Sequence, residues 1–431
     1  MSGARHEIAA LRARPGELSF QVRIGGGSAK EVFFRTETPV TPPADAALAA
    51  CLIPAMRSGG TLTMNDPVSP RILRTQREYQ AIQRAWSLDW DLGQESLREL
   101  DVVAPSRPAA EQEPGRVAAF FSGGVDSWST VLANPDVTDL IFVRGFDLIP
   151  GAPQHAGLGD EVEARLREAA AALPLPLHVV ETDIREFSDP LVRWEAYNGS
   201  ALVAVALLFE SLFERVLIAG DTDHQMQVPV GTARMVDQLW SSERLEIVDD
   251  GGRFNREQRL RLIAEHPVVQ RTLRVCWENP GGAYNCGRCR KCLLTMVSLE
   301  AIDMRDRFSA FPDELDLNPL EHFAADSRIA LTLWEDVLDT AREAGRSDLE
   351  GAVAPVVARG KQKLGLPDSY RGRAFNDLAA ALRDAAARTA EAEAREATTK
   401  AQLDAVLSSR SWRASAPLRR LANRRRRRNA Q

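Results

Sequence analysis

The sequence predicts an α/β protein with a Rossmann-like parallel sheet in its central part, a small α+β domain before it and a helical extension after it. Four short, almost wholly apolar runs alternate with helical segments between residues 116 and 300. This alternation is typical of buried parallel strands with helices on both faces of the sheet. The length of 431 residues suggests roughly two or three domains. Hydrophobic residues make up 44 % of the chain, which is enough for a sizeable core.

Residues 1–105 are expected to form the small α+β domain. Two runs that alternate between apolar and polar residues, LSFQVRI and EVFFRTE, lie on either side of a glycine run, and this pattern predicts a β-hairpin. Two segments with helical spacing follow, DAALAACLIPAM and SPRILRTQREYQAIQRAW. The stretch PSRPAAEQEPG at 105–115 is rich in proline and glutamate and predicts a linker.

Residues 115–300 are expected to form the parallel-sheet domain. The predicted strands are RVAAFF (116–121), DLIFVRG (139–145), LHVVET (177–182), RVLIAG (215–220) and LEIVDD (245–250). Ligands of open parallel sheets bind at the carboxyl ends of the strands. We therefore expect the functional site at that edge of the sheet.

The chain after residue 300 is expected to be helical and then disordered. Residues 301–370 contain two segments with helical spacing. Residues 371–408 are expected to form an Ala/Glu/Arg-rich helix. Few apolar residues occupy its heptad positions, so it is either a weak coiled coil or a solvated single helix. Residues 409–431 are a basic tail with too few apolar residues to form a core.

The charge distribution separates the tail from the body of the chain. The net charge is −6, yet Arg410–Gln431 contains nine arginines and no acidic residue, which leaves −15 for the rest. An acidic body argues against a protein that binds nucleic acid over its whole surface. The tail could contact an anionic membrane or RNA, and the simpler alternative is a solubilising end. The N-terminus lacks the apolar segment of a signal peptide, so a cytoplasmic location is expected.

The loop after the first of the predicted parallel strands carries the strongest functional signal. RVAAFF leads directly into SGGVDS (122–127), where a helix begins. Two glycines allow a sharp turn with exposed backbone N–H groups, two serine hydroxyls flank them, and the helix N-terminus adds a positive partial charge. These features favour a site for phosphate or pyrophosphate. The alternative is an ordinary strand–helix turn capped by serine and aspartate.

SGGVDS resembles the SGGxDS signature of the PP-loop superfamily, the N-type ATP pyrophosphatases, and the strand–helix order from 116 to 300 resembles that superfamily as well. The resemblance implies an enzyme that cleaves ATP between the α- and β-phosphates, adenylates an oxygen of its substrate and lets a nitrogen or sulfur nucleophile displace AMP. It implies ATP contacts at Ser122, Gly123, Gly124, Val125, Asp126 and Ser127. Mg²⁺ is expected with the phosphates to neutralise their charge.

Other candidate catalytic residues lie at the predicted carboxyl edge of the sheet. Only one lysine, Lys291, occurs between 116 and 300, so we expect arginine or metal to balance the phosphates, with Arg144 as the first candidate. Asp221 follows the fourth of these strands and could hold metal or substrate. The catalytic candidates are therefore Asp126, Arg144 and Asp221, and His224 is a weaker candidate for proton transfer.

Four of the five cysteines form a second motif. Cys276, Cys286, Cys289 and Cys292 follow the spacing C-x9-C-x2-C-x2-C. Four thiolates close together suit a tetrahedral structural Zn²⁺. The same donors could hold an iron–sulfur cluster, and four free thiols are the remaining alternative. A zinc site far from the chemistry is our expectation.

A PP-loop domain that ends in such a cysteine cluster resembles the 7-cyano-7-deazaguanine synthase family. That resemblance implies an ATP-dependent synthase that forms a nitrile from a carboxylate and ammonia, with a structural zinc. This chain differs in its long N- and C-terminal additions, in the segment GDTDHQMQVPVGTARMVDQLW and in the longer first cysteine spacing. The fold, the use of ATP and the zinc are carried over, whereas the deazapurine substrate is not.

The leading hypothesis is an AMP-forming ligase that adenylates a carboxylate or amide oxygen of a small-molecule acceptor for attack by ammonia or an amine. One alternative is a tRNA-modifying or sulfur-transfer enzyme of the same superfamily. Another is a non-catalytic nucleotide-binding scaffold. The segment SRSWRASAPLRRL (409–421) is similar to tails of bacterial glycosyltransferases, which suggests a link to surface polysaccharides. A homodimer is one expectation for the assembly.

Overall fold

The computed structural model describes residues 3–89, 96–109, 115–149, 151–152, 155, 157–220, 222–224, 226 and 231–371. The chain divides into two compact units, Met1–Gly372 and Arg373–Gln431, and all described residues belong to the first. Asp221, nearly all of the predicted helix at 371–408 and the tail at 409–431 lie outside the described residues.

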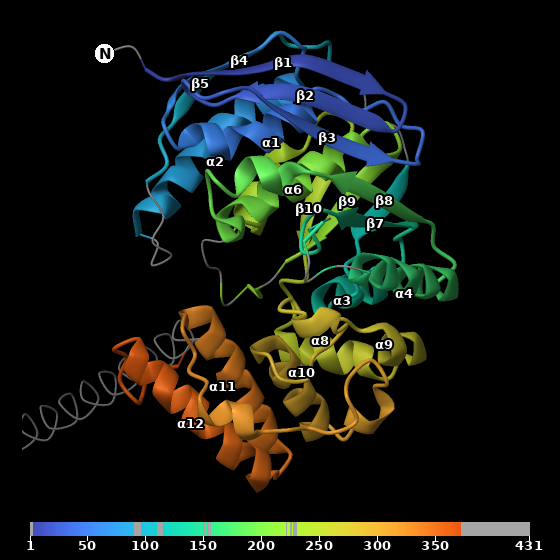
Figure 1. Cartoon of the computed structure of the whole chain (residues 1–431), viewed down its shortest axis with the longest axis vertical. Coiled ribbons are helices and arrows are strands. Elements are labelled where there is room, and N and C mark those ends of the chain that lie inside the picture. The colour runs from blue at the N-terminus through green and yellow to red at the C-terminus, as the bar shows by residue number, and fades with distance from the viewer. Residues whose placement is uncertain are drawn as a thin grey trace, which may run out of the picture. The chain divides into compact units, whose positions relative to one another are not determined.

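A single ten-stranded sheet runs through the described part of the chain (Figure 1). Its strands are β1 (Arg5–Arg14), β2 (Glu17–Arg23), β3 (Lys30–Thr36), β4 (Gly60–Met64), β5 (Leu100–Val103), β6 (Arg116–Phe120), β7 (Asp139–Arg144), β8 (Leu177–Thr182), β9 (Phe213–Ala219) and β10 (Glu246–Asp250). Their order is β10-β9-β6-β7-β8-β3-β2-β1-β4-β5. Most neighbouring pairs are parallel, which confirms the predicted α/β class.

The five strands β6 to β10 are parallel to one another, and β6 lies in their middle. The chain first adds β7 and β8 on one side of β6 and then crosses over to add β9 and β10 on the other side. The strand order therefore reverses between β6 and β9. Ligands of open α/β sheets bind at such a reversal, outside the carboxyl ends of the strands.

The N-terminal strands extend the same sheet. β3 pairs with β8 in antiparallel orientation, and the register places Phe34 opposite Thr182. The junction is reinforced by side chains, because the Thr182 hydroxyl donates to the Phe33 carbonyl at 2.7 Å and the Asp183 carboxylate accepts from the Phe33 N–H at 2.9 Å. The regions 1–105 and 115–300 consequently share one continuous sheet. Sequence patterns gave no sign of this pairing, because β3 and β8 are separated by about 140 residues of chain.

Helices cover both faces of the sheet. They are α1 (Asp45–Met56), α2 (Pro70–Asp89), α3 (Val125–Ala133), α4 (Leu158–Ala172), α5 (Ile184–Ser188), α6 (Trp194–Leu208), α7 (Arg234–Asp237), α8 (Arg256–Ala264), α9 (Pro267–Thr272), α10 (Arg290–Ala301), α11 (Arg328–Glu343) and α12 (Ser347–Lys363). Helices α1 and α6 pack together on one face, whereas α3 packs with α8 on the other (Figure 1). None of the helices in the described part of the chain is both long enough and apolar enough to cross a membrane.

The side chains from Val117 to Phe121 show why β6 is apolar after its first residue, Arg116. Ala118 and Phe120 belong to the core that contains α1 and α6, whereas Val117, Ala119 and Phe121 belong to the core beneath α3, α4 and α8. Successive side chains of a strand point to opposite faces of the sheet, so a strand with helices on both faces must be apolar at every position. This burial fixes the end of β6, and with it the starting point of the SGGVDS loop.

The last described helices, α11 and α12, pack against each other and bury a separate apolar cluster that includes Leu331, Trp334 and Val353. Helix α11 also contacts α10, which carries the last cysteine of the cluster. The Ser327 hydroxyl accepts from the N–H of Ala330 at 3.1 Å and so caps the start of α11.

Candidate functional site

The loop between β6 and α3 makes a tight turn at its two glycines. Gly123 has a φ of +75°, a conformation that residues other than glycine adopt only with strain. Gly124 is the N-cap of α3 with extended backbone angles, and no side chain caps the helix there. The first N–H groups of α3 are thus left without a side-chain acceptor, as an anion site at a helix N-terminus requires.

Two serine hydroxyls flank this turn. The Oγ atoms of Ser122 and Ser127 lie 3.4 Å apart, and the Ser127 hydroxyl also donates to the carbonyl of Gly124 at 3.1 Å. The N–H of Arg274 donates to the carbonyl of Gly123 at 2.9 Å and holds the turn from outside. The loop is therefore fixed by backbone contacts, while the Ser122 side chain remains exposed.

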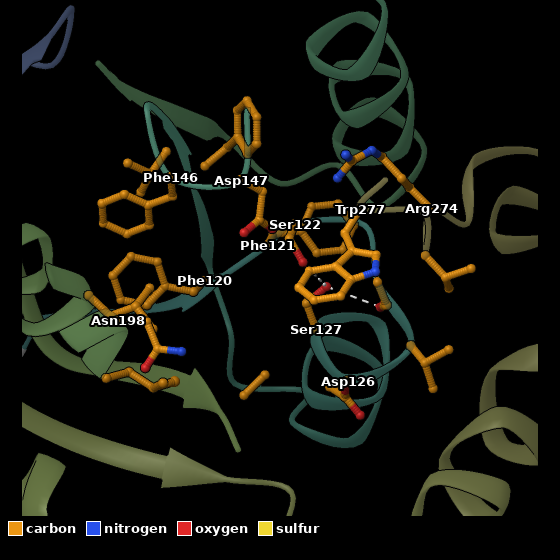
Figure 2. Close-up of a pocket in the computed structure, with 18 of the residues that line it drawn as sticks. Phe120, Phe121, Ser122, Asp126, Ser127, Phe146, Asp147, Asn198, Arg274 and Trp277 are labelled. Atoms are coloured by element: carbon orange, nitrogen blue, oxygen red, sulfur yellow. Dashed lines mark hydrogen bonds between the residues drawn. The ribbon is translucent and has the colours of Figure 1, made fainter. Parts of the chain in front are cut away.

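The loop opens into a cavity of about 390 Å³ at the carboxyl ends of the central strands. Figure 2 shows Ser122, Asp126 and Ser127 on one side of it and the aromatic rings of Phe120 and Phe146 on the other. The cavity also reaches residues of β7, β9 and the start of α6. Its position matches the edge of the sheet at which the sequence predicts a ligand, and its size falls within the range of small-molecule sites, about 300–1,000 Å³.

Asp126 lines the cavity, but its carboxylate is engaged by two arginines. Arg259 donates to it at 2.6 Å and Arg256 at 3.4 Å. Burial tends to raise the pKa of Asp126, yet the two guanidinium groups outweigh burial and hold that pKa below its usual value. Arg259 is buried and also donates to the carbonyls of Gly220 and Gly251, which follow β9 and β10. Asp126 therefore links α3 to the loops after two strands and stays ionised at neutral pH.

Arg144, predicted to contact the phosphates, lies outside the cavity wall. Its guanidinium donates to Glu163 at 2.6 Å and to Asp160 at 2.7 Å, both in α4. Arg185, which occupies a similar place after β8, donates to Asp189 at 2.6 Å and stacks on Trp194. Arg144 ends β7 and Arg185 lies in α5 just after β8, both at the expected edge, but nearby acidic residues neutralise them.

The cations that do reach the cavity come from a later part of the chain. Arg256, Arg274 and Lys291 line it, and sequence reasoning did not assign them to the phosphate site. The one available signal in the sequence was that Lys291 is the single lysine between 116 and 300. Its place inside the cysteine motif, however, suggested a role near the metal rather than at the phosphates. His224 is exposed and is not among the residues that line the cavity.

The four cysteines of the motif come together as predicted. Their Sγ atoms all lie within 4.8 Å of one another, with Cys276–Cys289 and Cys286–Cys292 each at 3.9 Å. Zinc–sulfur bonds of about 2.3 Å in a tetrahedron place the sulfurs about 3.8 Å apart, so the cluster fits a single metal ion. Shared hydrogen bonds with Cys289 and Cys292 lower the pKa of Cys276, and the contact with Cys276 raises the pKa of Cys289 to about 12.

Backbone N–H groups surround the sulfurs. The N–H of Asn279 donates to Cys276 Sγ at 3.3 Å, and the N–H of Cys289 donates to Cys286 Sγ at 3.3 Å. Such donors stabilise thiolates and orient them toward an ion. The four cysteines could therefore hold a metal ion.

The cysteine cluster adjoins the cavity rather than lying at a distance, which corrects our expectation of a remote site. Cys276 is itself part of the cavity wall, together with Trp277 and Lys291. Trp277 is 58 % exposed, and the Lys291 ammonium lies 5.4 Å from the centre of its ring. A spacing pattern cannot reveal this proximity, because it depends on how the segment after α9 returns to the SGGVDS loop.

Comparison of the chain with protein-family models, with curated proteins and with solved structures gives no match. The interpretation of the site therefore depends on its own residues and geometry.

Proposed function

We propose that the cavity binds ATP, with the phosphates on the SGGVDS loop, and that the protein is an AMP-forming, ATP-dependent enzyme. One observation carries the proposal: a glycine turn with two hydroxyls and an uncapped helix N-terminus lies where the strand order reverses, and it opens into a cavity lined by cations. Each of these features favours anion binding, and their coincidence at one sheet edge favours a nucleotide.

In this proposal the N–H groups of Gly124 and the first turn of α3 hold phosphate oxygens, and the hydroxyls of Ser122 and Ser127 donate to them. Lys291 supplies a further positive charge: its ammonium lies 5.4 Å from the centre of the Trp277 ring, and its charge helps to lower the pKa of Asp126. These donors are fixed before the ligand arrives and can stabilise charge that develops on a leaving pyrophosphate.

Mg²⁺ would need a carboxylate that is not already neutralised. Three acidic residues line the cavity in the described part of the chain: Asp126 is paired with two arginines, and Glu195 lies 3.5 Å from Arg193. The third, Asp147, follows β7 and has no ion pair recorded there (Figure 2). We therefore assign Asp147, rather than Asp126, as the carboxylate for the magnesium ion.

The reaction follows from the leading hypothesis. A carboxylate or amide oxygen of the acceptor attacks the α-phosphorus, the bond to the β-phosphate oxygen breaks, and pyrophosphate leaves. Ammonia or an amine then attacks the activated carbon and displaces AMP with the oxygen that was adenylated. The aromatic half of the cavity, with Phe120, Phe146 and Trp194, offers apolar surface for the planar parts of the ligands.

Zinc is the metal that we propose for the cysteine cluster. Four sulfurs within 4.8 Å leave room for one ion, whereas an iron–sulfur cluster spreads its cysteines around several iron atoms. In this role the metal carries no step of the reaction. It fixes the segment that brings Trp277 and Lys291 to the cavity.

The first test is nucleotide binding, which needs no knowledge of the acceptor. We expect the purified protein with Mg²⁺ to bind ATP, and Ser122→Ala to weaken binding by about tenfold, because a hydroxyl donor to a charged phosphate is lost. Ser58→Ala, an exposed serine after α1, is the control and should bind ATP like the wild type. If the wild-type protein binds no ATP, or if Ser122→Ala binds it unchanged, the proposal is wrong. Release of pyrophosphate with candidate acids is the second test.

A further inference from the structure

We infer that Arg274 is the principal anion-binding side chain of the cavity and that Asn279, anchored to the cysteine cluster, positions it. The ligand group is an oxyanion, either the pyrophosphoryl group of a nucleotide or the carboxylate of an acceptor. The first of these sources rests on the proposed function, whereas the second does not.

Among the residues that the structure describes, no carboxylate pairs with the charge of Arg274. The residue is only 7 % exposed and lines the cavity (Figure 2). Its Nη2 donates to the amide oxygen of Asn279 at 3.2 Å, and its buried Nε has no acceptor among the described residues. The described structure records no carboxylate within salt-bridge distance of its guanidinium.

Arg305 is also buried with an unpaired Nε, but it donates to the Pro312 carbonyl and does not line the cavity. Two arginines nearer to Arg274 in the chain have carboxylate partners. Arg259, at least as deeply buried, donates to the carboxylate of Asp126 and to several backbone carbonyls. Arg271, three residues before Arg274, is exposed and pairs with Glu168 at 3.1 Å. A buried charge without a partner carries a large desolvation cost. A cavity-lining arginine in this state is therefore best explained by an anionic ligand that completes the pair.

The position of Arg274 brings that anion to the SGGVDS loop. The N–H of Arg274 donates to the carbonyl of Gly123, and its own carbonyl lies 3.6 Å from where a Cβ on Gly124 would be. The planar guanidinium can donate two parallel hydrogen bonds to a phosphate or carboxylate. An oxyanion held by Arg274 would thus lie next to the turn that presents the N–H groups of α3.

Asn279 holds the guanidinium in place and is itself held by the cluster. It is fully buried, with a φ of +42°. Its side-chain amide donates to the carbonyl of Ala283 at 2.9 Å and of Cys276 at 3.4 Å, and its backbone N–H donates to Cys276 Sγ. A metal ion bound through Cys276 would fix Asn279 and, through its Oδ1 atom, the direction of the Arg274 side chain. Asn279 is therefore a positioning residue.

The experiment measures the binding of pyrophosphate, ATP, AMP and acetate by calorimetry. We expect Arg274→Gln to bind pyrophosphate and ATP at least tenfold more weakly, with little change for AMP. Arg274→Lys should recover part of the loss, because lysine keeps the positive charge but lacks the paired donors of the planar guanidinium. Arg271→Gln, an exposed arginine of the same segment, is the control. If Arg274→Gln loses affinity for acetate alone, the anion is the carboxylate of the acceptor, and this result would also support the inference.

Asn279→Ala should weaken pyrophosphate binding while AMP binding stays unchanged, and removal of metal with a chelator should do the same. A purely structural asparagine would affect both ligands equally. Unchanged binding of pyrophosphate and acetate by Arg274→Gln would overturn the inference. If the wild type and Arg274→Gln both still bind ATP in that case, the proposed function survives. If the wild type binds pyrophosphate through Arg274 but does not bind ATP, the inference survives and the proposed function fails.

Discussion

The two glycines of the SGGVDS loop should respond differently to alanine, because they have different backbone conformations. At Gly123 the φ of +75° is left-handed, which costs an alanine about 1–2 kcal/mol. An added Cβ there would also lie 2.8 Å from Leu166 Cδ2 and would force that side chain to move. At Gly124 the angles are φ −81° and ψ 170°, which alanine adopts freely.

A methyl group at Gly124 affects the site more than the fold. It would lie 3.4 Å from Ser122 Oγ, on the path by which phosphate oxygens would reach the N–H groups of α3. We expect Gly124→Ala to lose about 0.5–1 kcal/mol of stability, because alanine is a poorer N-cap residue than glycine. We expect it to bind ATP about tenfold more weakly, the effect of one lost charge-assisted hydrogen bond.

The assay compares both variants with the wild type by thermal melting and by ATP titration. At about 2 °C per kcal/mol for a large chain, Gly123→Ala should melt about 2–4 °C lower from its backbone angle alone, with the Leu166 contact adding to this, whereas Gly124→Ala should melt about 1–2 °C lower. Equal destabilisation by the two substitutions would refute the reasoning from backbone angles. A stable Gly124→Ala that binds ATP normally would refute the placement of the phosphates.

Three further predictions concern the cysteine cluster, the Asp126 ion pair and a buried carboxylate at the start of α1. Cys292→Ser should lower bound metal, measured by mass spectrometry, together with the melting temperature, whereas Cys51→Ala in α1 should leave the metal content unchanged. Arg259→Gln leaves the charge of Asp126 with one weaker partner and should cost about 3–5 kcal/mol, seen as the lowest melting temperature among these variants. Burial raises the pKa of Asp45 from 3.8 to about 6, so its ionisation costs stability as the pH rises through that window. Asp45→Asn should then be more stable than the wild type at pH 7.5 by up to about 3 kcal/mol, with no difference at pH 3.5.

Local features of the site were predictable from the sequence because their physical causes lie within a few residues. The run from Val117 to Phe121 is apolar at every position because helices cover both faces of the sheet. Such a run predicts a buried parallel strand. The turn needs a glycine at 123, and the sequence supplies it. The cysteine spacing likewise indicated a four-thiol site, and the four sulfurs do come together.

The cations of the cavity were not predictable, because nothing local distinguishes a paired arginine from an unpaired one. Arg144 was a reasonable candidate by its position after β7, but α4 brings Glu163 and Asp160 to it from 19 and 16 residues away in the chain. Arg274 lies about 150 residues after the loop it serves, and no strand or helix pattern links the two. The pairing of β3 with β8 was hidden for the same reason.

In the proposed function, the segment from Arg274 to Lys291 would give the cysteine cluster a part in ligand binding without making the metal a reactant. One short stretch supplies the backbone donor that holds Gly123, a guanidinium that pairs with no carboxylate of the described residues, an exposed indole and an ammonium group at the cavity. The stretch contains little regular structure. The Asn285 side chain ties it to the backbone of Leu273, Val275, Cys276 and Ala310, and a second constraint at the sulfurs would hold its polar groups in place. A metal ion held by Cys276 at its start and by Cys286 and Cys289 in its second half would supply that constraint. Loss of the ion should consequently reduce anion binding at temperatures where the sheet remains folded, and this order of events separates a positioning metal from one that only stabilises the fold.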